Sequence, residues 1–155
     1  MIKIILKSNN YYCLWHTNGN DTLIMDNNLI SWYPAIVDLT SACQKLSIAQ
    51  ETEITEYNLD QFYEWMLSDK TTVDCERFLD FWNITSDLAY SANDMFCGDT
   101  EEYISIYDKL FYGSNLPSIN SSQDKYSPTW DISEIKMLKS VIQSGLHLFA
   151  KYLNA

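Results

Sequence analysis

Residues 52–66, TEITEYNLDQFYEWM, contain the point at which the hydrophobic pattern of the chain changes its period. Over residues 52–57 apolar and polar side chains alternate, which predicts a short strand. From Leu59 onward the apolar residues recur at helical spacing, through Phe62 to Met66, which predicts a helix. The sequence before this stretch is rich in strand signals and the sequence after it in helix signals.

Toward the N-terminus the sequence predicts short strands over residues 2–7, 11–16 and 22–25. Polar turn residues separate them, and Asn18-Gly19 is the strongest hairpin signal in the chain, because both residue types tolerate positive φ. A β-meander is the simplest topology for these strands. A short helix is also predicted over residues 38–46.

Toward the C-terminus the pattern predicts helices over residues 74–92, 101–111 and 131–152. The first is apolar over a wide arc, which is typical of a central helix, and the second is followed by Gly113, a favourable C-terminal capping residue. The third begins with Asp131 and Glu134 at capping-box spacing. We therefore predict a single domain over residues 1–155 of the α+β class, with an N-terminal antiparallel β-meander of three to four strands packed against a C-terminal group of four to five helices.

Chain length and cysteine spacing bear on the compartment. A chain of 155 residues can bury a sizeable core without disulfides, and its four cysteines form no CxxC pair. The apolar run at the N-terminus is too short for a secretory signal, and no segment approaches the length of a membrane span. We expect a cytoplasmic protein with buried or half-buried free thiols.

The motifs of common enzyme classes are absent from the sequence. It has no GxSxG, GxxxxGK[ST] or GxGxxG, a single arginine, Arg77, and two histidines, His16 and His147, without partners at metal-ligand spacing. We expect neither a cofactor nor a metal, and no enzymatic activity. A carboxylate-dependent small hydrolase, glycosidase-like, remains an alternative, but acidic pairs are numerous and nothing distinguishes one of them.

Charge is the most informative property of the chain. The formal net charge is −11, and residues 51–108 contain 15 acidic residues against Lys70 and Arg77, a net charge of −13. Such a surface repels phosphate backbones and anionic lipid, so we expect neither nucleic acid nor membrane as a direct partner. The acidic side chains either form an ordinary solvated surface or dock onto a cationic protein, and electrostatic steering would accelerate that docking.

Several motifs together carry a family resemblance that extends from about residue 11 to residue 149. They are Tyr12-Cys13-Leu14-Trp15, Asp80-Phe81-Trp82-Asn83 followed by Asp87, the segment Tyr107–Gly113, Leu116-Pro117, Tyr126-Ser127-Pro128-Thr129-Trp130, Val141 and Gly145-Leu146. The pattern resembles the small acidic immunity proteins of bacterial polymorphic-toxin and contact-dependent growth inhibition systems.

This resemblance implies a protein without catalysis that binds and neutralises a cognate toxin domain, commonly a basic nuclease. It implies a scaffold role for the motif aromatics Trp82, Tyr107, Tyr126 and Trp130. The toxin-binding candidates come from the acidic stretch, with Phe96 and Tyr103 as aromatic anchors. The acidic candidates are Glu53, Glu56, Asp60, Glu64, Asp94, Asp99, Glu101 and Glu102. A non-catalytic adaptor that binds through an apolar groove is a further alternative, and the oligomeric state stays open.

Overall fold

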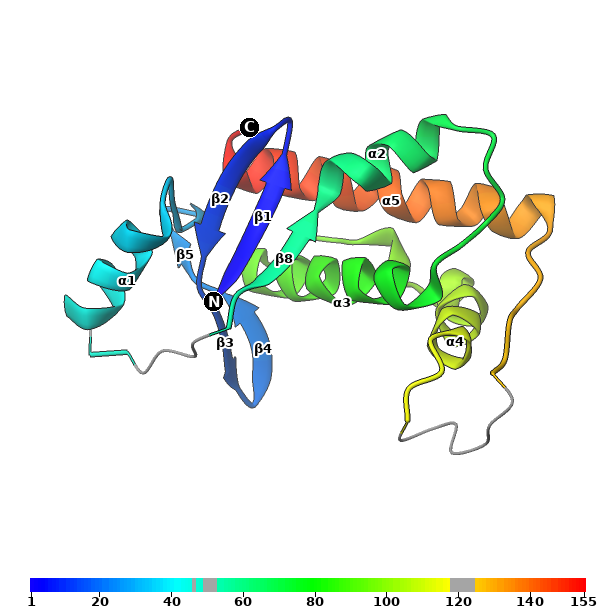
Figure 1. The fold of residues 1–155 in the computed structure, drawn as a ribbon, viewed down its shortest axis with the longest axis horizontal. Helices are drawn as coiled ribbons and strands as arrows, with labels where there is room; N and C mark the ends of the chain where they lie inside the picture. The colour runs from blue at the N-terminus through cyan, green and yellow to red at the C-terminus, as the bar shows by residue number, and fades with distance from the viewer. Residues whose placement is uncertain (46, 49–52, 118–124) are drawn as a thin grey trace.

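The computed structural model describes residues 1–45, 47–48, 53–117 and 125–155, and it has strands in the N-terminal part and helices in the C-terminal part (Figure 1). The strands are β1 (Ile2–Leu6), β2 (Asn9–Cys13), β3 (Trp15–Asn18), β4 (Asn20–Leu23), β5 (Met25–Asp26), β6 (Leu29–Ile30), β7 (Trp32–Tyr33) and β8 (Thr55–Asn58). The helices are α1 (Ile36–Lys45), α2 (Leu59–Leu67), α3 (Cys75–Ala92), α4 (Ile104–Gly113) and α5 (Ile132–Leu153), with two 3₁₀ turns, η1 (Cys97–Asp99) and η2 (Glu101–Tyr103). The predicted α+β class is confirmed.

The main sheet has four strands in the order β7-β2-β1-β8. The β1–β2 and β2–β7 pairs are antiparallel, whereas β8 lies parallel to β1, with Ile4 opposite Tyr57. Two small hairpins, β3–β4 and β5–β6, complete the strand region, and Gly19 adopts a φ of +85° between β3 and β4. The predicted strand over residues 11–16 is divided at Leu14, where the chain leaves the main sheet for the β3–β4 hairpin.

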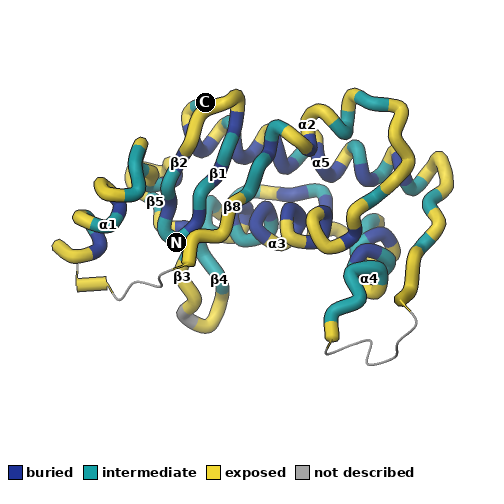
Figure 2. The backbone as a smooth tube through the Cα atoms, in the orientation of Figure 1, coloured by how far each residue is buried: buried dark blue, intermediate teal, exposed yellow. Residues whose placement is uncertain are grey.

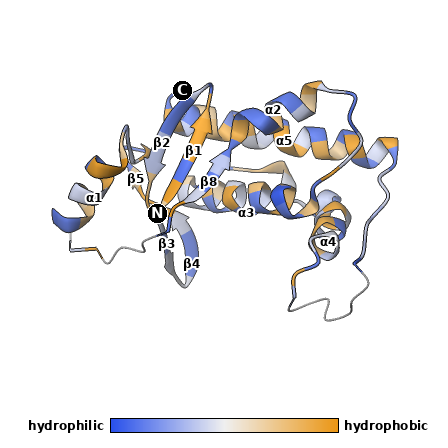
Figure 3. Ribbon diagram, viewed as in Figure 1, coloured by the Kyte–Doolittle hydropathy of each residue, from blue (hydrophilic) through white to orange (hydrophobic). Residues whose placement is uncertain are grey.

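The core lies between the main sheet and the long helices α3 and α5, which run side by side and are buried along much of their length (Figures 1 and 2). On β1 the side chains of Ile2, Ile4 and Leu6 are buried and alternate with half-buried residues, as expected for a strand with one face on the core. Figure 3 shows apolar stretches on β1 and α5, two of the elements that contribute side chains to this core. The wide apolar arc of α3 is confirmed, since this helix buries residues on several sides.

Helix α5 begins as the sequence predicts. The side chain of Asp131 accepts a hydrogen bond from the backbone N–H of Glu134 at 2.9 Å, and the Glu134 carboxylate accepts one from the backbone N–H of Asp131 at 2.9 Å. This is a complete capping box, and it satisfies two backbone donors of the first turn.

Gly113 has a different role from the one predicted. It is the last residue of α4 and does not have a left-handed conformation, which the chain adopts two residues later at Asn115. A Cβ at Gly113 would lie 2.5 Å from the sulfur of Cys75 and 2.9 Å from Pro128. The glycine therefore permits close packing of α4 rather than a helix cap.

The cysteines are free thiols, as predicted, with Cys13, Cys43 and Cys75 buried and Cys97 half-buried. Burial raises the pKa of Cys13 to about 12, which keeps this thiol protonated. None of the helices in the described ranges combines the length and the apolar character needed to cross a membrane.

Candidate functional site

Four of the predicted acidic residues lie on β8, on the segment before it and on α2. Glu53 and Glu64 are exposed. Glu56 forms an ion pair with Lys3 across the β1–β8 pair, with 2.9 Å between the nitrogen and the carboxylate oxygen. Asp60 accepts hydrogen bonds from the turn between β1 and β2, so its carboxylate already has partners within the fold.

The other acidic candidates lie between the end of α3 and the start of α4. Glu101 and Glu102 are exposed on η2, and Asp99 accepts a hydrogen bond from the Ser86 hydroxyl on α3 at 2.5 Å. Asp94 contacts α5 instead, where Lys151 lies 2.7 Å and the Tyr152 hydroxyl 2.8 Å from one carboxylate oxygen. These bonds, with one from the backbone N–H of Met95, lower the pKa of Asp94 to about 2.

The aromatic candidates differ in accessibility. Tyr103 is half-buried at the end of η2. Phe96 is only 2% exposed and packs edge-on against Trp82, with 6.0 Å between the ring centroids. The prediction of Phe96 as an anchor for a partner is therefore wrong, because its ring fills the core. Of the motif aromatics, Trp82 is buried in the core as predicted, and Tyr126 is exposed.

The solvent-facing side of α3 carries carboxylates that the predicted site leaves out. Glu76, Asp80 and Asp87 are separated by four and by seven residues, so they lie along one face of the helix. The side chains of Glu76 and Asp80 are exposed, and that of Asp87 is half-buried. This helix lies close to both groups of predicted acids, because the charges of Asp80 and Asp87 act on Tyr57 of β8 and Ser86 donates a hydrogen bond to Asp99.

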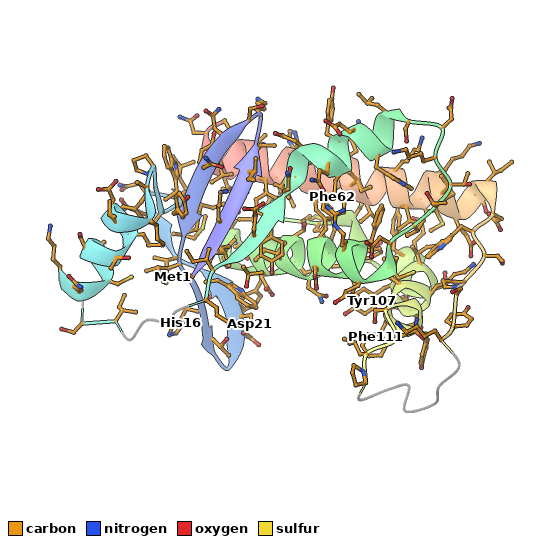
Figure 4. All side chains as sticks on the ribbon, viewed as in Figure 1. Met1, His16, Asp21, Phe62, Tyr107 and Phe111 are labelled. Carbon is orange, nitrogen blue, oxygen red and sulfur yellow. The ribbon has the colours of Figure 1, made fainter. Side chains whose placement is uncertain are left out.

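Asp87 lies where the hairpin packs on α3. Its carboxylate accepts a hydrogen bond from the indole N–H of Trp15 at 3.0 Å. Burial nevertheless raises the pKa of Asp87 to about 6, against the lowering effect of that bond, and the negative charges of Asp21 and Asp99 raise it further. Figure 4 shows Asp21 on the hairpin near one end of α3 and Tyr107 on α4 near the opposite end. Asp21, Asp87 and Asp99 thus form a cluster of like charge.

Asp80 continues this negative region toward the N-terminus of α3. Although the Asp80 residue is exposed, partial loss of solvent around its carboxylate raises its pKa, and the charges of Glu76 and Asp74 add to the effect. Tyr57 on β8 has a pKa raised to about 12, first by burial and then by the charges of Asp80 and Asp87. We call Asp21, Glu76, Asp80, Asp87 and Asp99 the α3 acidic face.

Cations do not neutralise this face in the described part of the chain. The ion pairs there join Lys3 to Glu56, Lys109 to Glu134 and Lys151 to Asp94, and none includes a member of the α3 acidic face. Arg77 is on the same helix, but its guanidinium is hydrogen-bonded to Gln61 of α2 and lies over the Phe62 ring, 5.8 Å from the centroid. The face therefore combines mutual repulsion with carboxylate oxygens open to solvent.

The signal for this face was present in the sequence. Acids at positions 76, 80 and 87 have spacings that place them on one side of any helix. The electrostatic interaction of Asp87 with Asp21 and Asp99 depends on tertiary packing, since those residues come from a hairpin and a 3₁₀ turn. Chemically, the arrangement attracts cationic groups. Within the described ranges, no group of three or more histidine, cysteine or acidic side chains is placed to hold a metal ion.

No protein-family model, curated protein or solved structure is found to be similar to this chain.

Proposed function

We propose that this protein is a non-catalytic immunity protein that binds a cationic toxin domain, such as a basic nuclease, and neutralises it by occlusion. The observation that carries the proposal is the α3 acidic face, whose carboxylates repel one another and make no ion pair with the lysines of the described chain. Lysine or arginine side chains of a partner would relieve this repulsion on contact.

The same electrostatics would accelerate the encounter. A basic domain is drawn toward the negative region from a distance, and the association rate then falls steeply with ionic strength. Rapid capture suits an inhibitor that must reach a toxin before the toxin reaches its target. The family resemblance of the sequence motifs is a second and independent support.

The test requires a candidate toxin domain, which we expect to be encoded next to the gene of this protein. We expect the wild-type protein to protect cells that express this domain and to bind it in stopped-flow measurements at low salt. The double variant Glu76→Lys/Asp80→Lys, whose side chains are exposed, should associate at least about tenfold more slowly and lose much of the salt dependence.

The control is Asp26→Lys/Asp38→Lys, which changes the net charge equally at exposed positions outside the α3 acidic face. It should retain most of the association rate. Equal slowing by both double variants would leave net charge, and not the face, as the cause. Protection that survives Glu76→Lys/Asp80→Lys with an unchanged rate would contradict the proposal.

One observation favours the hydrolase alternative. Asp80 and Asp87 both have raised pKa values, as a general acid requires, and they are two helical turns apart, about 10 Å along the axis. Inverting glycosidases place their carboxyl groups roughly 6.5–9.5 Å apart and need one of the two ionised, so the raised pKa values, and not the spacing, are the feature that favours this function. Turnover of aryl glycosides that is abolished by either Asp80→Asn or Asp87→Asn would support this function over the first.

A further inference from the structure

We infer that the cavity between α3, η1 and α4, beside the α3 acidic face, receives an arginine side chain of the protein partner. The inference rests on the proposed function and adds the chemical identity of the anchoring group. The cavity has a volume of about 340 Å³ and opens to solvent, and its lining combines aromatic and aliphatic side chains with a carboxylate.

The apolar part of the cavity suits the alkyl stem and the planar head of an arginine. Trp82 is buried and forms the base of the cavity, and the half-buried ring of Tyr107 lies edge-on to it, with 5.5 Å between the centroids. Ile104, at the start of α4, is 53% exposed although it is a large aliphatic residue. A partner side chain that covers Ile104 removes apolar surface from water, which favours binding.

The polar part of the cavity supplies the acceptors. One oxygen of Asp99 accepts from the Ser86 hydroxyl, which holds the carboxylate in place and leaves its second oxygen available. The amide oxygen of Asn83 accepts a hydrogen bond from the Tyr107 hydroxyl at 3.1 Å. A guanidinium can donate to a positioned carboxylate and stack on the half-buried ring of Tyr107 at the same time, whereas a lysine ammonium cannot stack in this way.

Charge complementarity selects a cation over other occupants. The negative charge of Asp99 adds to that of Asp87, and no ion pair of the described residues includes either of them. An anionic or purely aliphatic group would leave this repulsion in place. A cationic head beside Asp99 removes it.

The test is an NMR titration of the ¹⁵N-labelled full-length protein with two peptides of equal length and charge, one of alternating arginine and glycine and one of alternating lysine and glycine. We expect the arginine peptide to shift the amide signals of Gly98, Asp99 and Ile104 and the indole signal of Trp82. It should bind at least about threefold more tightly than the lysine peptide.

Two variants examine the two parts of the cavity. Asp99→Asn should lower the affinity for the arginine peptide by about threefold to fivefold. The charge-matched control is Asp69→Asn, which replaces an exposed acid on the loop between α2 and α3 and should leave the affinity unchanged. Ile104→Ser should also lower the affinity for the arginine peptide, although it leaves the charge of the protein unchanged. Equal affinity for both peptides, or unchanged binding by Asp99→Asn, would overturn the inference.

Failure of this inference differs from failure of the proposed function. Shifts confined to Glu76 and Asp80, with none at Gly98, would overturn the arginine cavity and leave the acidic face as a docking surface. Signal shifts at the cavity that become smaller in Asp99→Asn and Ile104→Ser would support the arginine cavity. If the protein at the same time gave no protection against the candidate toxin domain, the immunity function would be overturned.

Discussion

The carboxylate of Asp60, in the first turn of α2, accepts a hydrogen bond from the backbone N–H of Lys7 at 2.6 Å. Its second oxygen accepts one from the backbone N–H of Ser8 at 2.8 Å. Lys7 and Ser8 form the turn between β1 and β2, and both have positive φ, 51° and 62°, which is unfavourable for residues with a Cβ. Asp60 thus stabilises a strained turn from a different element, and this contact explains its position better than partner binding does.

Replacement of Asp60 by alanine is expected to lower the free energy of unfolding by about 1–3 kcal/mol, because two backbone donors lose a charged acceptor. Urea denaturation measures the change. Glu64→Ala is the control, since Glu64 is exposed one turn further along the same helix and should change stability by less than about 0.5 kcal/mol. Similar values for both variants would show that the turn does not depend on Asp60.

Gly145 is expected to resist substitution even by alanine. In an open helix this change raises stability by about 1 kcal/mol. Here a Cβ would lie 2.6 Å from the ring of Phe81 and 3.1 Å from the methyl group of Thr85, both buried on α3. The crowding should outweigh the gain and destabilise Gly145→Ala by about 1–3 kcal/mol in thermal or urea unfolding.

Two companion variants identify the cause of the Gly145 effect. Gln143→Ala, at an exposed position of α5, should have little effect. Phe81→Leu shortens the group that the new Cβ meets, so its combination with Gly145→Ala should destabilise less than the two single changes added together. Strict additivity would argue against a direct contact.

Because the pKa of Asp87 is raised, a variant that lacks the negative charge at this position should be more stable than wild type, by an amount that depends on pH. The pKa in the folded protein is about 6, above the ordinary value of 3.8, so the folded state binds the proton more tightly than the unfolded chain. The contribution of this group to stability therefore falls as the pH rises from about 4 to 6. Asp87→Asn keeps an acceptor for the indole N–H of Trp15 and should be more stable than wild type at pH 7.5.

The expected gain for Asp87→Asn is at most about 1 kcal/mol, because part of the carboxyl faces solvent. At pH 3.5 the difference between the two proteins should vanish. Chemical denaturation at both pH values measures it. A variant less stable than wild type at pH 7.5 would show that the Trp15 bond requires the charged form.

Asp94 should show the opposite dependence. Its pKa is lowered to about 2 by Lys151 and Tyr152, so its contribution is present above pH 4 and is lost as the pH falls toward 2. Asp94→Asn is expected to be less stable than wild type at pH 7 by less than about 1 kcal/mol, and the difference should shrink at pH 3. In a Lys151→Gln background the effect of Asp94→Asn should become smaller, and an unchanged effect would exclude the ion pair as its source.

Local sequence accounts for much of the helical part of the fold. The change of period at Leu59 and the capping box of Asp131 and Glu134 act over a few neighbouring residues, so the starts of α2 and α5 could be predicted without any tertiary contact. The positive φ of Gly19 likewise follows from the residue type. The concentration of acidic residues in the middle of the chain was also visible in the sequence.

Tertiary packing decided what the acidic residues do. Asp60 and Asp94 became structural because a turn 53 residues away and a lysine 57 residues away lie within hydrogen-bond distance of their carboxylates. Phe96 is a core residue because it packs against Trp82 at the start of η1. Asp87 interacts with Asp21 and Asp99 because the fold brings a hairpin and a 3₁₀ turn close to α3. Hydrophobic period and capping are properties of sequence neighbours, so they could predict the starts of α2 and α5. Solvation and charge–charge distance are properties of the folded surface, and only that surface settles which carboxylates remain free.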